Sequence, residues 1–119
     1  MSPLIDIEFV QDLARLDAAG GSFLPQFIAG FSADVRATLE RLRACARAGE
    51  IAPLRSEAHR LKGSSASLGA LALARECDEI GRCAHRDDAA GACTHIESAL
   101  QALDATCDAI LQVGASHAH

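Results

Sequence analysis

The longest periodic segment of the chain constrains the fold most. Between residues 23 and 46, apolar side chains return at helical spacing: Phe23, Phe27, Phe31, Val35, Leu39, Leu42 and Ala46. Spacings of three and four residues place side chains on one face of an α-helix, so this segment predicts a long amphipathic helix with the row in the core. A strand would require alternating apolar and polar residues, and no segment shows that pattern.

Capping residues and glycines indicate where the first two helices begin and end. Asp6 is expected to cap a short helix that runs to about Leu16. Gly20-Gly21 is expected to break the chain after it, and Ser22 to cap the long helix. Gly49 then marks the C-terminal end of that helix.

Similar signals divide the rest of the chain. Pro53 suits the first turn of a third helix, which Gly69 is expected to end. A fourth helix is expected from about Leu71 to Arg86, and Asp87 or Asp88 is expected to cap a fifth. The tail, residues 114–119, is expected to fray.

Each of these helices carries one apolar row. The rows are Ile7, Val10 and Leu13; Leu54, Ala58, Leu61, Ser65 and Leu68; Leu73, Cys77, Ile80 and Ala84; and Cys93, Ile96, Leu100, Leu103, Cys107 and Ile110. Short connections force consecutive helices to run antiparallel. We therefore predict one all-α domain over residues 1–119, an antiparallel up-down-up-down four-helix bundle with a short N-terminal helix that caps one end.

Composition narrows the functional classes. A net charge of −5 argues against nonspecific nucleic-acid binding. No apolar run approaches the length of a membrane span, and the N-terminus lacks the basic and apolar segments of a signal peptide. The five cysteines are scattered without a close-set framework, which is typical of reduced thiols. We expect a cytoplasmic protein without direct membrane insertion.

One short segment stands out chemically. The only lysine, Lys62, lies three residues after His59 and directly before Gly63, whereas the ten other Lys or Arg positions are arginine. On a helix these three residues share a face. A glycine inside a helix costs about 1 kcal/mol relative to alanine, so it needs another reason, and the simplest is room for a second molecule beside His59.

The face around His59 suits an incoming phosphoryl group. Its neighbours at helical spacing are Arg55, Ser56 and Ala66, together with Lys62 and Gly63, and the adjacent Arg60 adds a further cation. We expect Arg55, Ser56, Arg60 and Ala66 to contact the partner protein. The apolar row of this helix is offset from His59, so the imidazole is expected to be exposed. An exposed imidazole is mostly uncharged at neutral pH and retains a lone pair for attack.

The segment from Ala58 to Ala70, AHRLKGSSASLGA, closely resembles the signature of histidine-containing phosphotransfer (HPt) domains, and Leu73 to Ile80 resembles the helix that follows it in that family. The resemblance covers essentially the whole chain. It implies that His59 accepts the phosphoryl group, through Nε2, that Lys62 pairs with it and that Gly63 clears the approach.

The chain departs from some family members at one position on the next helix. These members place a glutamine there, where it hydrogen-bonds at the site, and this chain has Gly81. The second polar partner is then either absent or supplied by a neighbour such as Arg82 or Arg75.

The resemblance implies a phosphorelay intermediate. The phosphoryl group would pass from an aspartate of a receiver domain to His59, and then to another receiver aspartate. The receiver domains bind the Mg²⁺, so this chain needs no cofactor of its own. It has no glycine-rich phosphate loop and no kinase motif, so it is not expected to be a kinase by itself. Such modules often form the C-terminal end of hybrid sensor histidine kinases, so the chain could belong to a membrane-bound parent.

Two other kinds of site find less support. Cys83-Ala84-His85 and Cys93-Thr94-His95 could suggest zinc ligands, but residues two apart on a helix diverge by about 200°. No metal site is expected. Ser64 and Ser65 lack the acidic partner and the strand-turn-helix elbow of a serine nucleophile. The tail residues His117 and His119 are expected to be incidental.

One alternative function remains open. A helical bundle of this kind can bind signalling partners without chemistry, as a non-catalytic docking module. The joint presence of His59, Lys62 and Gly63 favours the relay, because a degenerate copy would be expected to lose the histidine first. A metal-dependent bundle hydrolase ranks far behind, since the Glu-x-x-His pairs of di-metal bundles are missing.

Overall fold

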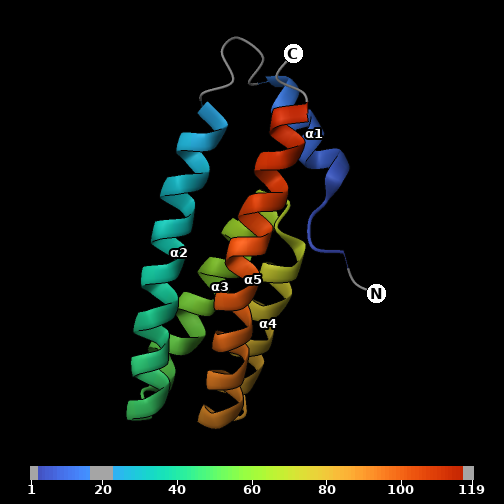
Figure 1. The fold of residues 1–119 in the computed structure, drawn as a ribbon. Coiled ribbons are helices and arrows are strands. Elements are labelled where there is room, and N and C mark those ends of the chain that lie inside the picture. Colours follow the sequence, from blue (N-terminus) through green and yellow to red (C-terminus); the bar gives the residue numbers. More distant parts are fainter. Residues whose placement is uncertain (1–2, 17–22, 117–119) are drawn as a thin grey trace.

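The structure is a computed structural model, and it describes residues 3–16 and 23–116. Within these ranges every regular element is a helix (Figure 1). The helices are α1 (Ile7–Leu16), α2 (Phe23–Ala48), α3 (Ile51–Ser67), α4 (Leu71–His85) and α5 (Ala89–Ser116). The predicted all-α class is therefore confirmed for this part of the chain.

Several helix ends lie where the sequence places them. The Phe9 amide donates to Asp6 Oδ1 at 3.2 Å, and the Gly91 amide donates to Asp88 Oδ1 at 2.9 Å, so Asp88 rather than its neighbour caps α5. Gly49 and Gly69 adopt φ angles of 74° and 79° just beyond α2 and α3. The predicted break at Gly20-Gly21 and the predicted cap at Ser22 lie outside the described residues.

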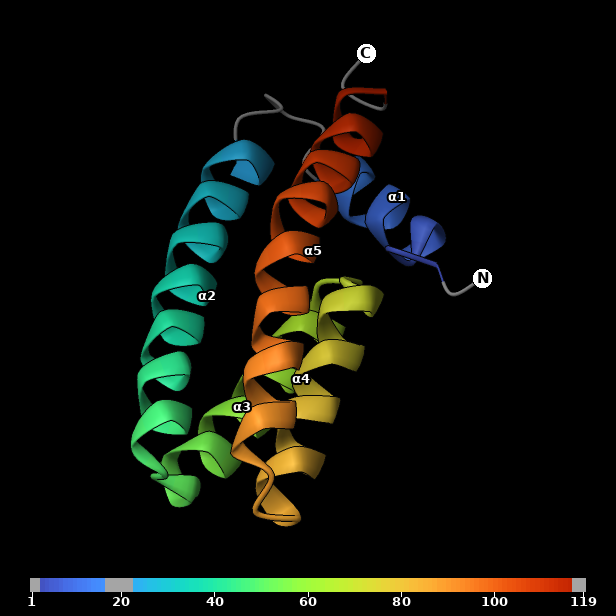
Figure 2. The ribbon, with the colours of Figure 1, turned by 60° about the horizontal axis from the view of Figure 1, so that its bottom comes forward.

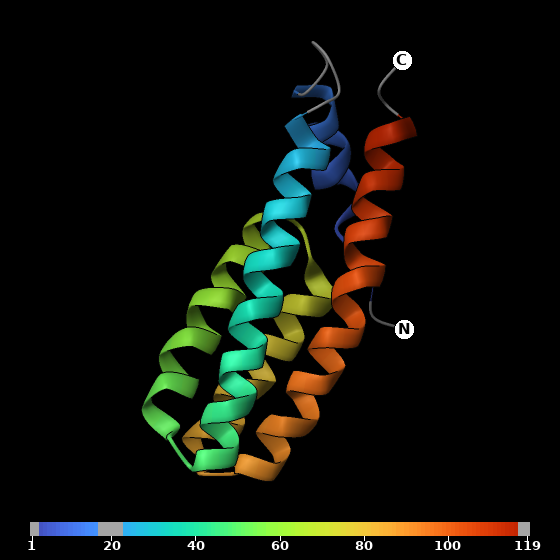
Figure 3. The same cartoon turned by 60° about the vertical axis from the view of Figure 1, so that its left-hand side comes forward.

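The four long helices enclose a common core. α2 contacts α3, α3 contacts α4, α4 contacts α5, and α5 contacts α2, so each helix has two neighbours in the bundle (Figures 2 and 3). Their inward side chains are fully buried, among them Leu39, Leu61, Ile80 and Leu103. No helix of the described residues is both long enough and apolar enough to cross a membrane.

The short helix α1 lies beside the C-terminal part of α5, at one end of the bundle (Figures 1 and 3). Backbone hydrogen bonds hold the segment before it against the α3–α4 connection: the Asp6 amide donates to the Gly69 carbonyl at 2.8 Å, and the Ala72 amide donates to the Leu4 carbonyl at 3.1 Å. Val10 is buried, as predicted, but Ile7 of the same predicted row is 55% exposed.

The phenylalanine row on α2 differs from its prediction. Phe23 and Phe27 are 64% and 45% exposed, and the core positions in these turns are Leu24 and Ile28. The physical reason is rotation, because each step of four residues turns the direction of a side chain by about 40°. Counted back from the buried Val35, the row has turned by about 120° when it reaches Phe23. The predicted core row is therefore wrong in the first turns of α2.

Helix α5 continues to Ser116, so residues 114–116 of the predicted tail are helical in the structure. Its last turns lie close to α2: a Cβ added at Gly114 would lie 2.7 Å from Leu24 Cδ2. The side chain of Leu24 on α2 therefore lies close to the backbone of α5 at Gly114. Residues 117–119 lie outside the described part of the chain.

Candidate functional site

His59 lies on the outer face of α3. Its neighbours Ala58 and Leu61 are fully buried, whereas the histidine itself is exposed, as predicted. This alternation follows from the amphipathic pattern of α3, whose buried row is rotated away from residue 59. The imidazole has no hydrogen bond to any residue that the structure describes, and the residue as a whole is exposed.

A surface groove between α3 and α4 runs along one side of His59. It is lined by Ala52, Arg55, Ser56, Ala58, His59 and Lys62 of α3, by Cys77, Asp78, Gly81, Arg82 and His85 of α4, and by Arg86. The lining therefore contains four Lys or Arg side chains and one carboxylate. In a protein with a net charge of −5, this local excess of positive charge favours an anionic ligand beside the imidazole.

The carboxylate of Asp78 joins two of these cations. Its Oδ1 lies 2.9 Å from Lys62 Nζ, and its Oδ2 lies 3.1 Å from Arg82 Nε. The hydrogen bond from Lys62, strengthened by the charge of Arg82, keeps the pKa of Asp78 below its ordinary value. Sequence reasoning missed Asp78, because its contact with Lys62 depends on how α3 packs against α4 and has no local spacing signal.

The predicted contact residue Arg60 points away from this groove. It contacts Glu57 of its own helix at 2.9 Å and reaches α2, where it donates to Thr38 Oγ1 at 3.2 Å and lies 3.8 Å from Asp34 Oδ2. Because Arg60 lies about 100° around the helix from His59, it faces α2 rather than α4.

The other predicted contact residues lie near His59. Arg55 and Ser56 line the groove, and the Ser56 hydroxyl donates to the Ala52 carbonyl at 3.3 Å. Ala66 is exposed two turns further along the same face of α3. Gly63 faces open space, because a Cβ added there would meet no atom of the described residues within 4 Å beyond its own stretch of helix backbone. On the turns of α3 that follow His59, the outer face therefore carries the small residues Gly63 and Ala66, which leave space for a partner protein.

Gly81 lies in the groove, at the position where some HPt domains carry a glutamine. A Cβ at this position would meet only the Ala58 Cβ, at 4.0 Å, so a side chain could be accommodated. Of the two arginines considered as replacements, Arg75 donates to the Pro3 carbonyl at 2.8 Å and does not line the groove. Arg82 does line it, and is the replacement that the geometry allows.

An apolar hollow lies on the other side of α3, toward α1 and α2. Its lining comprises Leu13, Phe23, Leu24, Phe27, Ser64, Ser67 and Leu68. The rings of Phe23 and Phe27 stack with their centroids 5.7 Å apart. Because Phe23 and Phe27 are 64% and 45% exposed, their rings present apolar surface beside Ser64 and Ser67 of α3. The sequence prediction assigned these rings to the core and so missed this surface.

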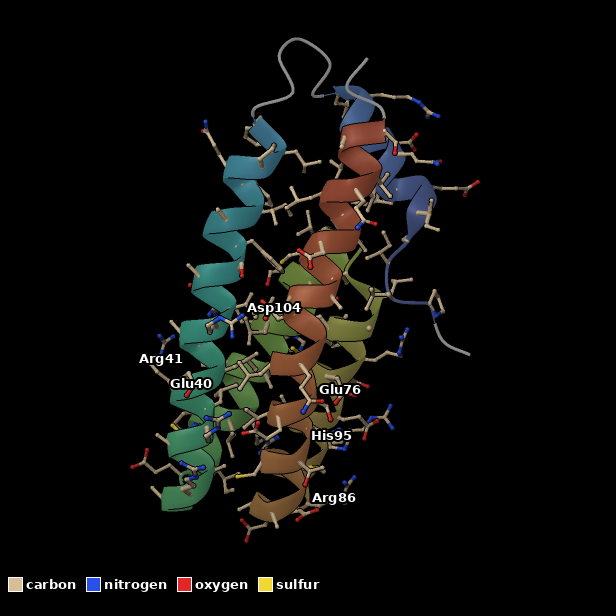
Figure 4. The ribbon with its side chains drawn as sticks, viewed as in Figure 1. Glu40, Arg41, Glu76, Arg86, His95 and Asp104 are labelled. Carbon is tan, nitrogen blue, oxygen red and sulfur yellow. The ribbon has the colours of Figure 1, made fainter. Side chains whose placement is uncertain are left out.

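The two Cys-x-His segments are separated by the structure. His85 lines the groove, Cys83 is buried, and His95 Nδ1 lies 2.9 Å from Glu76 Oε2, across the contact between α5 and α4 (Figure 4). Among the described residues, no three or more His, Cys, Asp or Glu side chains gather as they would around a metal ion.

The thiol of Cys77 lies at the bottom of the groove. Cys77 is fully buried, and burial raises its pKa to about 12. The buried thiol therefore packs as a small apolar side chain beneath the groove, and its raised pKa disfavours the thiolate.

Comparison with known proteins agrees with this arrangement. A model of the Hpt domain family matches residues 26–112, a range that includes His59 and every other residue that lines the groove. Searches of curated proteins and of solved structures found no match. The family match covers well over half of the 119 residues. The chain belongs to the Hpt domain family, whose members take part in two-component phosphorelay.

Proposed function

We propose that this protein is a phosphorelay intermediate that accepts a phosphoryl group on His59 from a receiver-domain aspartate and passes it to another receiver aspartate. The observation that carries the proposal is the exposed imidazole, free of hydrogen bonds to described residues, at the edge of a groove lined by four Lys or Arg side chains. No other histidine of the described residues has a lysine beside it.

The chemistry is an in-line displacement. The lone pair of His59 Nε2 attacks phosphorus while the bond from phosphorus to the aspartyl oxygen breaks, and the receiver aspartate leaves as a carboxylate. The other ring nitrogen retains its proton. The reverse reaction, with a second receiver, returns the phosphoryl group to an aspartate. The receiver supplies the Mg²⁺ that stabilises the transferred group, and this chain supplies the imidazole and cations.

Lys62 and Arg82 are the cations best placed for the phosphoryl oxygens. Both line the groove with His59, and both are held there by Asp78. As a compact point charge, the Lys62 ammonium can follow the phosphoryl group during transfer. Arg82 would supply the polar contact that a glutamine at the position of Gly81 supplies in some relatives.

The receiver is proposed to dock over the outer face of α3. Gly63 leaves room for its backbone, and the exposed rings of Phe23 and Phe27 offer apolar contact on the α2 side. Arg55, Ser56 and Ala66 would contact the receiver around His59. Such a surface combines apolar anchors with a charged rim, which is the usual composition of a transient protein interface.

The proposed topology is an up-down-up-down antiparallel bundle. Only residues 49–50, 68–70 and 86–88 separate the four long helices. Connections this short allow consecutive helices to pack side by side only when they run in opposite directions. This arrangement keeps α3 and α4 adjacent along their length, and so forms the groove from two sides.

The experiment that tests this function is phosphoryl transfer from a ³²P-labelled receiver domain. We expect the chain to acquire label that is stable in base and lost in acid, as a phosphoramidate bond is, and to pass it to a second receiver. If receivers bind the chain but no label is transferred, the non-catalytic docking module is the correct function.

A further inference from the structure

We propose that Asp78 is a positioning residue whose carboxylate competes with the phosphoryl group for Lys62 and Arg82, and so sets how strongly His59 holds that group. This inference rests on the proposed function of His59. It adds a residue to the reaction that acts through the two cations and does not itself touch the reacting atoms.

Among the described residues that line the groove, Asp78 is the one carboxylate, and both of its oxygens are engaged. Oδ1 accepts from Lys62 at 2.9 Å and Oδ2 accepts from Arg82 at 3.1 Å. The side chain of Asp78 is 31% exposed, less than the 48% and 64% of the two cations, so it is the most enclosed member of the trio. It therefore holds the two cations together, one from α3 and one from α4.

The charges of the groove change when His59 is phosphorylated. Without phosphate, Asp78 neutralises one of its two partner cations. A phosphoryl group on His59 brings about two negative charges and three acceptor oxygens to the same groove. It attracts Lys62 and Arg82 and repels Asp78, so the two anions compete for the same donors. The phosphorylated state is therefore less stable than it would be without Asp78.

The competition between Asp78 and the phosphoryl group suits a relay protein, because it helps His59 to release the group again. An intermediate that bound its phosphoryl group too tightly would accept it from the first receiver and fail to pass it on. Asp78 offers both cations an alternative partner when the phosphoryl group departs. Asp78 thereby raises the free energy of the phosphohistidine relative to the receiver aspartyl phosphate and favours onward transfer.

The test replaces Asp78 by asparagine, which has the same shape and lacks the charge. A matched control is Asp104→Asn, since Asp104 also pairs with an arginine across two helices, at 2.6 Å from Arg36 Nη2. Asp104 lies on α5 (Figure 4), whereas the groove is lined by α3, α4 and Arg86. Both variants lose one negative charge, so any general effect of net charge appears in both.

The first measurement needs no receiver. Phosphoramidate transfers its phosphoryl group to an imidazole nitrogen and releases ammonia, and ³¹P NMR then follows the titration of the phosphohistidine. We expect the pKa of the phosphoryl group to fall by about 0.5 to 1 in Asp78→Asn, because Lys62 loses its carboxylate partner and Arg82 keeps only the longer contact of 3.9 Å with Glu79, so both cations favour the dianion more strongly. Asp104→Asn should leave that pKa unchanged.

The second measurement uses one labelled receiver at equilibrium. We expect Asp78→Asn to raise the ratio of phosphohistidine to aspartyl phosphate by roughly 3- to 10-fold over wild type, and Asp104→Asn to leave it unchanged. An unchanged phosphoryl pKa and an unchanged ratio in Asp78→Asn would overturn the proposal, even if its melting temperature changes. If phosphoramidate labels His59 but no receiver exchanges with it, the relay function fails while the pKa comparison still decides the role of Asp78.

Discussion

Lys62 Nζ lies 2.9 Å from Asp78 Oδ1, so the single lysine of this chain is already bound to a carboxylate on the neighbouring helix. The ammonium is therefore held beside His59 before any phosphoryl group arrives, and it loses little further freedom when one binds. Since both side chains are about one-third to one-half exposed, this pair adds little to stability. Its importance lies in the position and the partners of the lysine.

Replacement of the proposed phosphoacceptor gives the first prediction. His59→Gln should abolish labelling by a phosphorylated receiver, because the amide nitrogen of glutamine has no lone pair available for attack. His85→Gln is the matched control, because His85 lines the same groove. This variant should be labelled on His59 as wild type is. The measurement is acid-labile, base-stable ³²P incorporation. Equal labelling of His59→Gln and wild type would remove His59 from the mechanism.

Removal of the lysine charge gives the second prediction. Lys62→Ala should slow phosphoryl transfer by a free energy on the order of 1–3 kcal/mol, the usual strength of a hydrogen bond to a charged group. Stability should change by less than about 1 kcal/mol, because the ion pair is exposed. Stopped-flow or quench measurements of transfer, with chemical denaturation alongside, check both numbers.

The control for Lys62→Ala is Arg36→Ala, which breaks the exposed pair with Asp104 on another face of the bundle. It should transfer at the wild-type rate. A Lys62→Ala protein that transfers as fast as Arg36→Ala would show that the lysine is only a solvated side chain.

The exposed rings on α2 give the third prediction. Phe27→Ser should weaken receiver binding by roughly 1–2 kcal/mol, as expected for an aromatic anchor at a partner surface. The loss of folding stability should be smaller than for a core phenylalanine, since the ring is 45% exposed. Isothermal titration with a receiver provides the measurement. Ile7→Ser, at a position on α1 that is 55% exposed, should bind as wild type does.

The buried thiol beneath the groove gives the fourth prediction. Burial raises the pKa of Cys77 from 9.0 to about 12. Between these values the unfolded chain releases the thiol proton and the folded chain retains it, so folding becomes less favourable as the pH rises. The melting temperature should therefore fall less steeply with pH in Cys77→Ala than in wild type above pH 9. Parallel slopes in the two proteins would contradict this burial effect.

Local signals were sufficient for most of the fold. Caps at Asp6 and Asp88 and glycines at 49 and 69 each act within one helical turn, so sequence spacing alone predicts where the helices begin and end. The phenylalanine row failed for a different reason. Spacings of four residues fit the helix only approximately, and over three steps the small error rotates a side chain from the core to the surface.

In the site, too, features within one helix can be predicted from the sequence, whereas contacts between helices cannot. His59, Lys62 and Gly63 belong to one helix, so their shared face follows from the helical repeat. The Lys62–Asp78 contact and the direction of Arg60 toward Asp34 depend on which helices pack against α3 and on how those helices are shifted and rotated relative to it. A single sequence holds no spacing that encodes these contacts, because they join residues from different helices.

The last prediction concerns Gly63, where stability and transfer should change in opposite directions. Gly63→Ala should raise the free energy of unfolding by up to about 1 kcal/mol, because the residue is helical and alanine restricts the unfolded chain. Outside the local helix backbone and the two chain neighbours, no atom of the described residues lies within 4 Å of the added Cβ, so no tertiary clash offsets this gain. Gly63→Gln should also fold, with its side chain extended into solvent.

Transfer should fall as this side chain grows, because it stands one helical turn from His59 in the path of the receiver. Gly69→Ala is the control with the opposite pattern. Gly69 has a φ of 79°, and a Cβ added there would lie 3.0 Å from Phe9 Cδ1, so alanine should lower stability. The folded fraction of this variant should transfer the phosphoryl group at the wild-type rate. Melting curves and transfer rates for Gly63→Ala, Gly63→Gln and Gly69→Ala test whether stability and transfer change in opposite directions at Gly63. A destabilised, fully active Gly63→Gln would mean that the glycine serves packing and that the receiver approaches from another side.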